Sequence, residues 1–404
     1  MTPGFVVLAL SLLLGLQPVA TDLYLPALPA LTLGFGAPMA QAQLTLTALL
    51  LAFGLSQLVW GPLSDRFGRR PILLLGLALF VVASIGSALA GHMAALVAWR
   101  AVQGAALGAS VMCARAIVRD LYAPADGARV MSKALSGLGV IACCSAPLGG
   151  LASDLFGWRA ALLLIGVFGA ATLAVIAWRF EETVRQRNLQ ALRPAVMATT
   201  WARIARHPTF WAYALLATAT YGGLFTFLAA SSFVLIHVIG LSKTQYGLVM
   251  FTMSLSYIGG TFACRRLLTR FGVRRTVAVA GAFSLAGGTL MGVLALAGVQ
   301  TVWAVILPFY LFMMAHGVHQ PCGQSGAVGP FPQAAGAASA LAGFIMMITA
   351  FAMGGWLGHS LAGIAPGTGS TAPLANGVWF WGVVCAAIAW TLVQRHGDGA
   401  PAKA

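Results

Sequence analysis

GPLSDRFGRRPILLLG, residues 61–76, places a short basic loop between two long apolar runs. Part of this stretch returns later in the chain, because DRFGRRP at 65–71 has a counterpart in TRFGVRR at 269–275. The Phe-Gly pairs of the two copies lie 204 positions apart, close to half of the 404 residues. A basic loop that recurs at half the chain length predicts two similar halves with the same order of elements.

The composition places the chain in a membrane. Hydrophobic residues make up 60% of it and charged residues only 8%, which is too little charge to cover a water-soluble domain. Apolar runs of about 18 residues or more recur along the whole length, as membrane-spanning helices require. Transmembrane β-strands would instead give segments of about ten residues with alternating polarity. The sequence therefore predicts an all-α polytopic membrane protein.

Twelve apolar spans can be marked along the chain. They cover residues 5–31, 42–63, 71–91, 94–117, 128–152, 158–179, 208–237, 244–264, 275–297, 301–320, 334–360 and 377–394. Together with the loop repeat, they predict two six-helix halves, residues 1–179 and 208–404. A basic, amphipathic central loop at 180–207 joins them. Transporters built in this way bind substrate between the halves, near the middle of the membrane.

The basic residues predict the orientation. With a cytoplasmic N-terminus, the 23 Lys and Arg fall on the cytoplasmic side except Arg100, Arg159 and Lys243, which is the positive-inside pattern. We therefore expect both termini in the cytoplasm and the chain in the inner membrane. This distribution accounts for the net charge of +15 without a nucleic-acid partner. The first residues, MTPGFVVLAL, lack the basic n-region of a signal peptide, so we expect a retained helix.

The sequence contains no recognisable catalytic, metal or nucleotide site. The six cysteines form no CxxC pair and mostly lie in apolar segments, which is typical of small core residues. The basic loop lacks the GxxxxGK[ST] phosphate cradle, which argues against ATP as the energy source. We expect a protein that is not an enzyme, uses no cofactor or metal, works as a monomer in the lipid bilayer and has a small molecule and protons as partners.

Several motifs resemble those of a known family. The loop at 61–76 resembles the signature of the major facilitator superfamily, and RAVQGAALGA at 100–109 is similar to the fourth-helix motif of its twelve-helix drug:proton antiporters. TDLYLPALP at 21–29 resembles the first-helix motif of the bicyclomycin- and chloramphenicol-resistance branch, and so do ARAIVRDLY and FPQAAGAASALAGF. The resemblance covers the whole chain. It implies the major facilitator fold and the export of hydrophobic drugs or related small molecules in exchange for protons, by alternating access.

Two departures from the family pattern matter. The fifth-helix motif GxxxGPxxGG appears as ACCSAPLGG, where Ala142 and Ala146 replace glycines and Pro147 is one residue closer to Gly149. In the second copy of the loop, Thr269 stands at the acidic position. Because the fifth-helix motif is associated with antiport, two alternatives stay open. They are an exporter dedicated to one metabolite or antibiotic class and a substrate–proton symporter.

Asp22 and Arg100 are the candidate proton-coupling pair. If the first span ends near Leu31, Asp22 lies about 13 Å inside it, and Arg100 lies about 9 Å inside the fourth span on the same side. Ionisable residues in membranes usually face the bundle interior and pair. We predict that the two approach each other, directly or through water, and that protonation of Asp22 biases the inward–outward equilibrium. A static ion pair is the alternative reading.

Other residues are expected to support this pair or to line the substrate cavity. Gln103, one helical turn after Arg100, is placed to orient the guanidinium, and Tyr24 belongs with Asp22 as a candidate for substrate contact. Aromatic and Met side chains suit promiscuous apolar binding, although on a membrane helix they face lipid at least as often. The candidates for the cavity wall are Tyr221, Phe225, Phe227, Met250, Phe251 and Phe344.

The loop at 61–76 is predicted to form a conformational latch. Asp65 can sit at the N-terminus of a helix of the other half, where the helix dipole favours an anion, and the family resemblance suggests the span at 334–360. The arginines of the loop can pair with Asp120. The predicted latch residues are Gly61, Asp65, Arg66, Gly68, Arg69, Arg70 and Asp120. In the fifth span, Pro147, Gly149 and Gly150 are predicted to form either a hinge or a plain kink.

Overall fold

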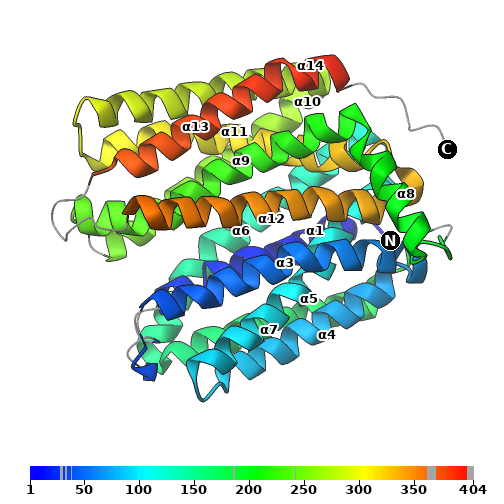
Figure 1. The fold of residues 1–404 in the computed structure, drawn as a ribbon, viewed down its shortest axis with the longest axis horizontal. Helices are drawn as coiled ribbons and strands as arrows, with labels where there is room; N and C mark the ends of the chain where they lie inside the picture. Colours follow the sequence, from blue (N-terminus) through cyan, green and yellow to red (C-terminus); the bar gives the residue numbers. More distant parts are fainter. Residues whose placement is uncertain are drawn as a thin grey trace. The chain divides into compact units, whose positions relative to one another are not determined.

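The computed structural model describes residues 1–27, 31, 34–37, 39–184, 187–241, 243–361 and 370–397, and the regular secondary structure within these ranges is helical (Figure 1). The helices up to the central loop are α1 (Pro3–Thr21), η1 (Leu25–Ala27), α3 (Met39–Phe67), α4 (Arg69–Ala88), α5 (Met93–Leu121), α6 (Pro124–Phe156), α7 (Trp158–Arg179) and α8 (Pro194–Ala205). Those after it are α9 (Pro208–Ser232), η2 (Phe233–Val238), α10 (Lys243–Leu296), α11 (Val302–Val328), η3 (Pro332–Ala334), α12 (Ala335–Leu361), α13 (Ala372–Trp390) and α14 (Leu392–His396).

The described residues include eleven helical stretches that are long and apolar enough to cross a membrane. The longest, in α10, contains two helices that meet at Gly272, where φ is 73°. Counting these separately gives the twelve predicted spans, so the prediction of an all-α polytopic fold is confirmed. Gly68, which separates α3 from α4, has a φ of 104°. The two glycines of the sequence repeat therefore break the chain at equivalent places, because only glycine adopts such angles at little cost.

The first helix is shorter than the predicted span at 5–31. α1 ends at Thr21, with Asp22 as its C-cap, and a short 3₁₀ turn follows at Leu25–Ala27. Pro26 prevents the α-helix from resuming through this turn, because it has no N–H to bond to the carbonyl of Asp22. Residues 28–30 of the predicted span lie outside the described residues. Asp22 is thus at a helix break rather than in mid-helix.

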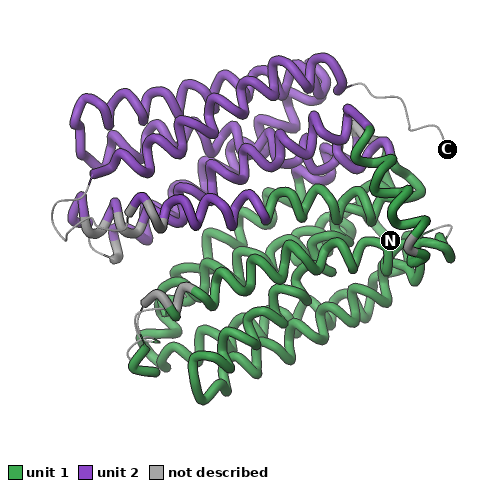
Figure 2. Tube along the Cα trace, in the orientation of Figure 1, with its two compact units in different colours: residues 1–123, 133–206, 331–347 green, residues 124–132, 207–330, 348–404 purple. Residues whose placement is uncertain are grey.

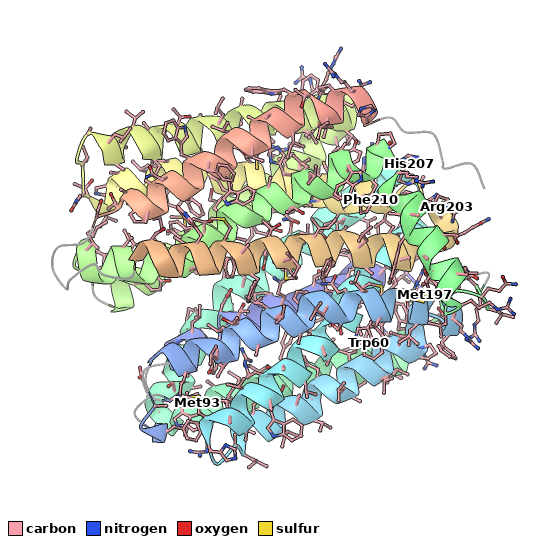
Figure 3. The ribbon with its side chains drawn as sticks, viewed as in Figure 1. Trp60, Met93, Met197, Arg203, His207 and Phe210 are labelled. Carbon is pink, nitrogen blue, oxygen red and sulfur yellow. The ribbon has the colours of Figure 1, made fainter. Side chains whose placement is uncertain are left out.

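The central loop contains a helix of its own, α8. In Figure 1 it runs transverse to the long helices of the first half, near the N-terminus of the chain. Its buried side is formed by Ile204, while Arg203, whose position Figure 3 labels, is exposed. This arrangement agrees with the amphipathic pattern of the loop, since a helix at a membrane surface needs one apolar and one charged face.

The chain forms two compact units, coloured separately in Figure 2. Unit 1 comprises residues 1–123, 133–206 and 331–347, and unit 2 comprises 124–132, 207–330 and 348–404. The first turns of α12 therefore belong to unit 1, and those of α6 to unit 2. The three-part division into 1–179, 180–207 and 208–404 remains a prediction.

Close packing in unit 1 depends on glycines of α5. A Cβ on Gly104 would overlap the carbonyl of Leu49 on α3, and one on Gly108 would lie 3.2 Å from the carbonyl of Phe53. The indole of Trp60 on α3, a residue labelled in Figure 3, donates to the carbonyl of Ala105 at 2.7 Å. Small residues that let backbones approach closely are the usual basis of helix packing in membranes.

Candidate functional site

Arg100 is a fully buried cation whose partners all lie in unit 1. It is 0% exposed, and its Nη2 donates to the carbonyl of Ala20 in the last turn of α1 at 2.7 Å. Its Nη1 donates to Gln103 Oε1, and the Gln103 amide donates onward to Ser84 Oγ at 2.7 Å. The guanidinium also lies over the ring of Tyr24, 4.3 Å from its centroid. Neutral groups thus surround this charge.

Asp22 lies beside this cluster without pairing directly with Arg100 in the described part of the chain. Its Oδ1 accepts a hydrogen bond from Thr21 Oγ1 at 2.8 Å, and the residue is half-buried. Arg100 contacts Ala20 and Tyr24, which lie two positions before and two positions after Asp22. The two ionisable residues therefore share one level of the bundle, but Arg100 binds the backbone and ring of the first helix rather than its carboxylate.

Tyr24 is positioned inside unit 1. It is 0% exposed, and its hydroxyl shares a hydrogen bond of 2.8 Å with Thr45 Oγ1 on α3. A cation over an aromatic face gains electrostatic stabilisation, which increases when water is excluded. The ring therefore helps to accommodate the buried charge of Arg100, and in this conformation it is closed off from solvent.

The predicted helix-5 residues lie in α6, which runs without interruption from Pro124 to Phe156. Gly149 packs directly on the chain after Asp22, because a Cβ there would overlap the carbonyl oxygen of Leu23. Gly150 has more room, with Pro26 Cβ at 3.8 Å, and Pro147 is exposed. The close approach of Gly149 therefore helps to position the chain that follows α1.

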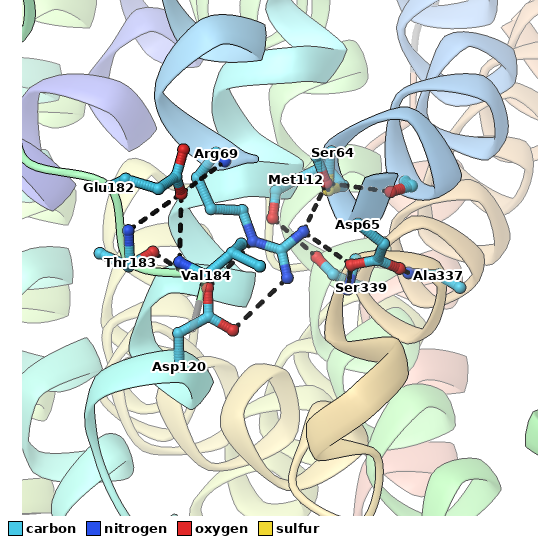
Figure 4. Close-up of polar contacts among 12 residues, drawn as sticks. Ser64, Asp65, Arg69, Met112, Asp120, Glu182, Thr183, Val184, Ala337 and Ser339 are labelled. Atoms are coloured by element: carbon cyan, nitrogen blue, oxygen red, sulfur yellow. Dashed lines mark hydrogen bonds and ion pairs between the residues drawn. The ribbon is translucent and has the colours of Figure 1, made fainter. Parts of the chain in front are cut away.

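Asp65 lies at the N-terminus of α12. Its two carboxylate oxygens accept hydrogen bonds from the backbone N–H groups of Gly336 (3.0 Å) and Ala337 (3.1 Å), as the part of Figure 4 around Asp65 shows. α12 has no acidic residue in its own first turn. An anion at this end satisfies free N–H groups and interacts favourably with the helix dipole.

Arg69 links Asp65 to Asp120. Its Nη1 donates to Asp65 Oδ1 at 2.7 Å, and its Nε donates to Asp120 Oδ2 at 3.0 Å. Asp120 also accepts from Thr183 Oγ1 at 3.0 Å. The side chain of Arg69 is only 3% exposed. The network therefore joins the end of α3 and the start of α4 to the end of α5 and the start of the central loop (Figure 4).

Glu182 is part of this network and was not among the predicted residues. Its carboxylate accepts from the backbone N–H of Arg69 at 2.8 Å and of Arg70 at 3.2 Å, so it binds the N-terminus of α4. It also accepts from the N–H groups of Thr183 and Val184. The sequence carried one usable signal, namely an acidic pair directly after a span in an otherwise basic loop.

The remaining loop residues have less central positions. Arg66 lies over the ring of Phe67, and Arg70 donates to the carbonyl of Ala177 at 3.0 Å. A Cβ on Gly61 would lie 2.8 Å from the carbonyl of Gly336, and one on Gly68 would overlap the Glu182 carboxylate. Of the three predicted arginines, the structure brings only Arg69 to Asp120.

The predicted cavity-wall residues have different environments. Phe227 is 1% exposed and stacks on Phe309, with ring centroids 3.7 Å apart, so it belongs to the core of unit 2. Phe251 is 42% exposed. Tyr221, Phe225, Met250 and Phe344 are half-buried. The sequence does not separate these cases, because aromatic residues occur on every face of an apolar helix.

An all-helical membrane fold of two compact units, with a buried arginine and an aspartate at the N-terminus of a neighbouring helix, is typical of a membrane transport protein. The chain belongs to the Major Facilitator Superfamily, whose family model matches residues 10–355. It is 30% identical to multidrug resistance protein D of Escherichia coli (strain K12), over 90% of this chain and 89% of that protein. It is 28% identical to a chloramphenicol resistance protein of Pseudomonas aeruginosa, over 81% and 77% of the two chains.

Solved structures show the same fold. The human organic anion transporter MFSD10 (TETRAN) superposes with a TM-score of 0.75 at 20% identity, over 97% of this chain and 100% of that one. The proton:xylose symporter XylE superposes with a TM-score of 0.79 at 14% identity, over 97% and 95%. At these identities the likeness concerns the fold alone.

Proposed function

We propose that this chain is a proton-coupled antiporter that exports hydrophobic drugs or related small molecules across the inner membrane. Relatives named for multidrug, chloramphenicol and bicyclomycin resistance support the substrate class. The observation that supports proton coupling most directly is the position of Asp22. It is a half-buried carboxylate at a helix break, with a hydroxyl as its partner.

The surroundings of Arg100 are what make Asp22 suitable for this role. The guanidinium is already compensated by the Ala20 carbonyl, the Gln103 amide and the Tyr24 ring. Asp22 can therefore gain or lose a proton without leaving Arg100 as an unpaired buried charge, which would be costly. By contrast, Asp65 and Asp120 are both held by Arg69, so their protonation would break ion pairs.

The network around Asp65 is proposed as the latch of the alternating-access cycle. Opening of the cytoplasmic side would separate α12 from α3, which requires the two hydrogen bonds from Gly336 and Ala337 to break. Hydrogen bonds to a charged acceptor contribute more than neutral ones. Asp65 would thereby stabilise the state in which the cytoplasmic side is closed.

Replacing Asp22 by Asn tests the coupling. Wild-type protein in proteoliposomes with an acidic interior is expected to release protons when chloramphenicol, bicyclomycin or a lipophilic cation is added outside. Asp22→Asn is expected to reduce this drug-dependent flux by about tenfold or more, because a membrane carboxylate of this kind carries the proton. Asp22→Glu should retain part of the flux, and Asp154→Asn, which changes an exposed acid of α6, should retain it all. Flux in Asp22→Asn equal to wild type would contradict the coupling role.

The same assay separates the alternatives. Protons that move with the substrate, rather than against it, would identify a symporter. A response to one compound class only would identify a dedicated exporter.

A further inference from the structure

We propose that Gln57 and Arg115 form a second rung of the cytoplasmic latch, deeper in the membrane than Asp65, and that Gly343 is the position at which α12 closes on it. This inference rests on the alternating-access cycle proposed above. Gln57 lies on α3, Arg115 on α5 and Gly343 on α12. All three belong to unit 1.

The two side chains are buried and bonded to each other. Arg115 Nη1 donates to Gln57 Oε1 at 3.1 Å, and Gln57 Nε2 donates to the carbonyl of Phe53 at 3.3 Å. Gln57 is 0% and Arg115 is 3% exposed. A cation and an amide at this depth are expensive to bury, so their position at a helix contact calls for a functional reason.

The backbone of α12 lies directly on this pair. A Cβ added to Gly343 would overlap Gln57 Oε1 and would lie 2.5 Å from Arg115 Nη1. One turn earlier on α12, Ser339 Oγ donates to the carbonyl of Met112 on α5 at 3.1 Å. Both contacts require α12 to be seated against α3 and α5, and both are lost when it moves away.

These contacts belong to a series of contacts between α12 and α3 that begins at Asp65. Along α12, Gly336, Ala340, Gly343 and Met347 face, in order, Asp65, Gly61, Gln57 and Gly54 of α3. On α3 the series covers about 16 Å at 1.5 Å per residue. The spacing of three or four residues keeps all members on one face of each helix. The proposed latch therefore has two rungs along α12, Asp65 and the Gln57–Arg115 pair, and the small residues Gly61 and Ala340 lie between them.

The series of α12 residues that face α3 ends with Met347. Met347, which packs on Gly54, is the last residue of α12 in unit 1, and the helix continues from Ile348 as part of unit 2. In the proposed cycle, withdrawal of α12 from α3 would break each of these contacts. Gln57 and Arg115 are thus positioning residues, which act on transport through the closure of α12.

Thiol accessibility tests the proposal without drug or proton gradient. The full chain carries Ser339→Cys as the reporter and keeps Cys385 as an internal control, with the other native cysteines replaced by Ala. Ser339 and Cys385 are both 0% exposed, in unit 1 and unit 2 respectively. Alkylation by N-ethylmaleimide is followed at each thiol by mass spectrometry, with the protein in nanodiscs.

Gly343→Ala is expected to raise the alkylation rate at position 339 by about fivefold, because the methyl group displaces the Gln57 amide and leaves a buried hydrogen bond unmade. Gly355→Ala on the same helix is the matched control, since a Cβ there meets no atom within 4 Å. Equal rates in the two variants would overturn the proposal. A parallel rise at Cys385 would overturn it as well, because the substitution would then loosen the whole fold.

Substitutions of Gln57 should act in opposite directions. Gln57→Glu is expected to slow alkylation at position 339, because a charge-assisted bond to Arg115 is stronger than a neutral one. Gln57→Met, of similar volume but without the acceptor, should speed it. Shifts in the same direction would refute the role of the rung. Since the assay needs no coupling, this result stands apart from the outcome of Asp22→Asn.

Discussion

Arg100 illustrates how a membrane helix accommodates a guanidinium without a carboxylate. The carbonyl of Ala20 is one of the last four of α1 and has no partner within the helix, so the cation satisfies an orphan acceptor at the negative end of the helix dipole. Among the described residues, the hydrogen bond of Asp22 is with the hydroxyl of Thr21 and not with the guanidinium of Arg100. The chemistry of the pair therefore depends on the end of α1.

Gly149 gives a prediction at the scale of single residues. Gly149→Ala should destabilise the protein by about 1–3 kcal/mol, because the new methyl group meets the backbone oxygen of Leu23, which cannot rotate away. Gly150→Ala is the control, since its Cβ would find van der Waals room. Thermal unfolding in detergent measures both variants. Equal unfolding midpoints would show that the chain after Asp22 yields, and that Gly149 is not needed to seat it.

At the scale of elements, the network around Arg69 places an anion at two helix N-termini that have none of their own. Neither α4 nor α12 has an acidic residue in its first turn. Glu182 serves α4, and Asp65 serves α12. α6 differs, because Asp126 lies in its own first turn. An anion supplied from another element ties the two elements together, whereas one in the same helix only caps it.

Glu182→Gln is therefore expected to loosen the start of α4 and to cost about 1 kcal/mol, since the neutral amide interacts less well with the N–H groups of Arg69 and Arg70. Glu181→Gln is the neighbouring control, because that side chain is 74% exposed and contacts the amino terminus at 3.4 Å. Hydrogen exchange of the first turn of α4 distinguishes the two. Similar exchange in both variants would contradict the capping role.

At the scale of the whole molecule, equivalent positions of the sequence repeat make different hydrogen bonds in the two units. Ser132 lies 204 positions before Gly336, and in unit 2 its hydroxyl donates to the carbonyl of Thr261 at 2.8 Å. Arg265, at the position equivalent to Gly61, donates to the carbonyl of Ser132 at 3.4 Å. In unit 2, the start of α6 is therefore bound by a carbonyl and an arginine, and Thr269 supplies no carboxylate there. In unit 1, the start of α12 is bound by the carboxylate of Asp65.

The orientation of the whole chain is open to a direct test. Gln190 and Gln300 are exposed loop residues on opposite sides of the membrane in the predicted topology. A cysteine at Gln190 should react with an impermeant maleimide in inside-out vesicles, and one at Gln300 should react in intact cells. Labelling of both from the same side would contradict the assignment of the termini to the cytoplasm.

Composition, hydrophobic runs and the repeated loop are local or periodic properties, and for this reason the sequence alone was enough to predict the membrane class, the twelve spans and the family. It also pointed to Asp65, Arg69 and Asp120, because charges are rare in this chain. The fold was needed to show that Arg100 binds a carbonyl and a ring, that Glu182 binds the N-terminus of α4 and that Gly343 lies on Gln57. Such contacts join residues far apart in sequence, and their geometry is set by how closely helix backbones approach rather than by any pattern along the chain.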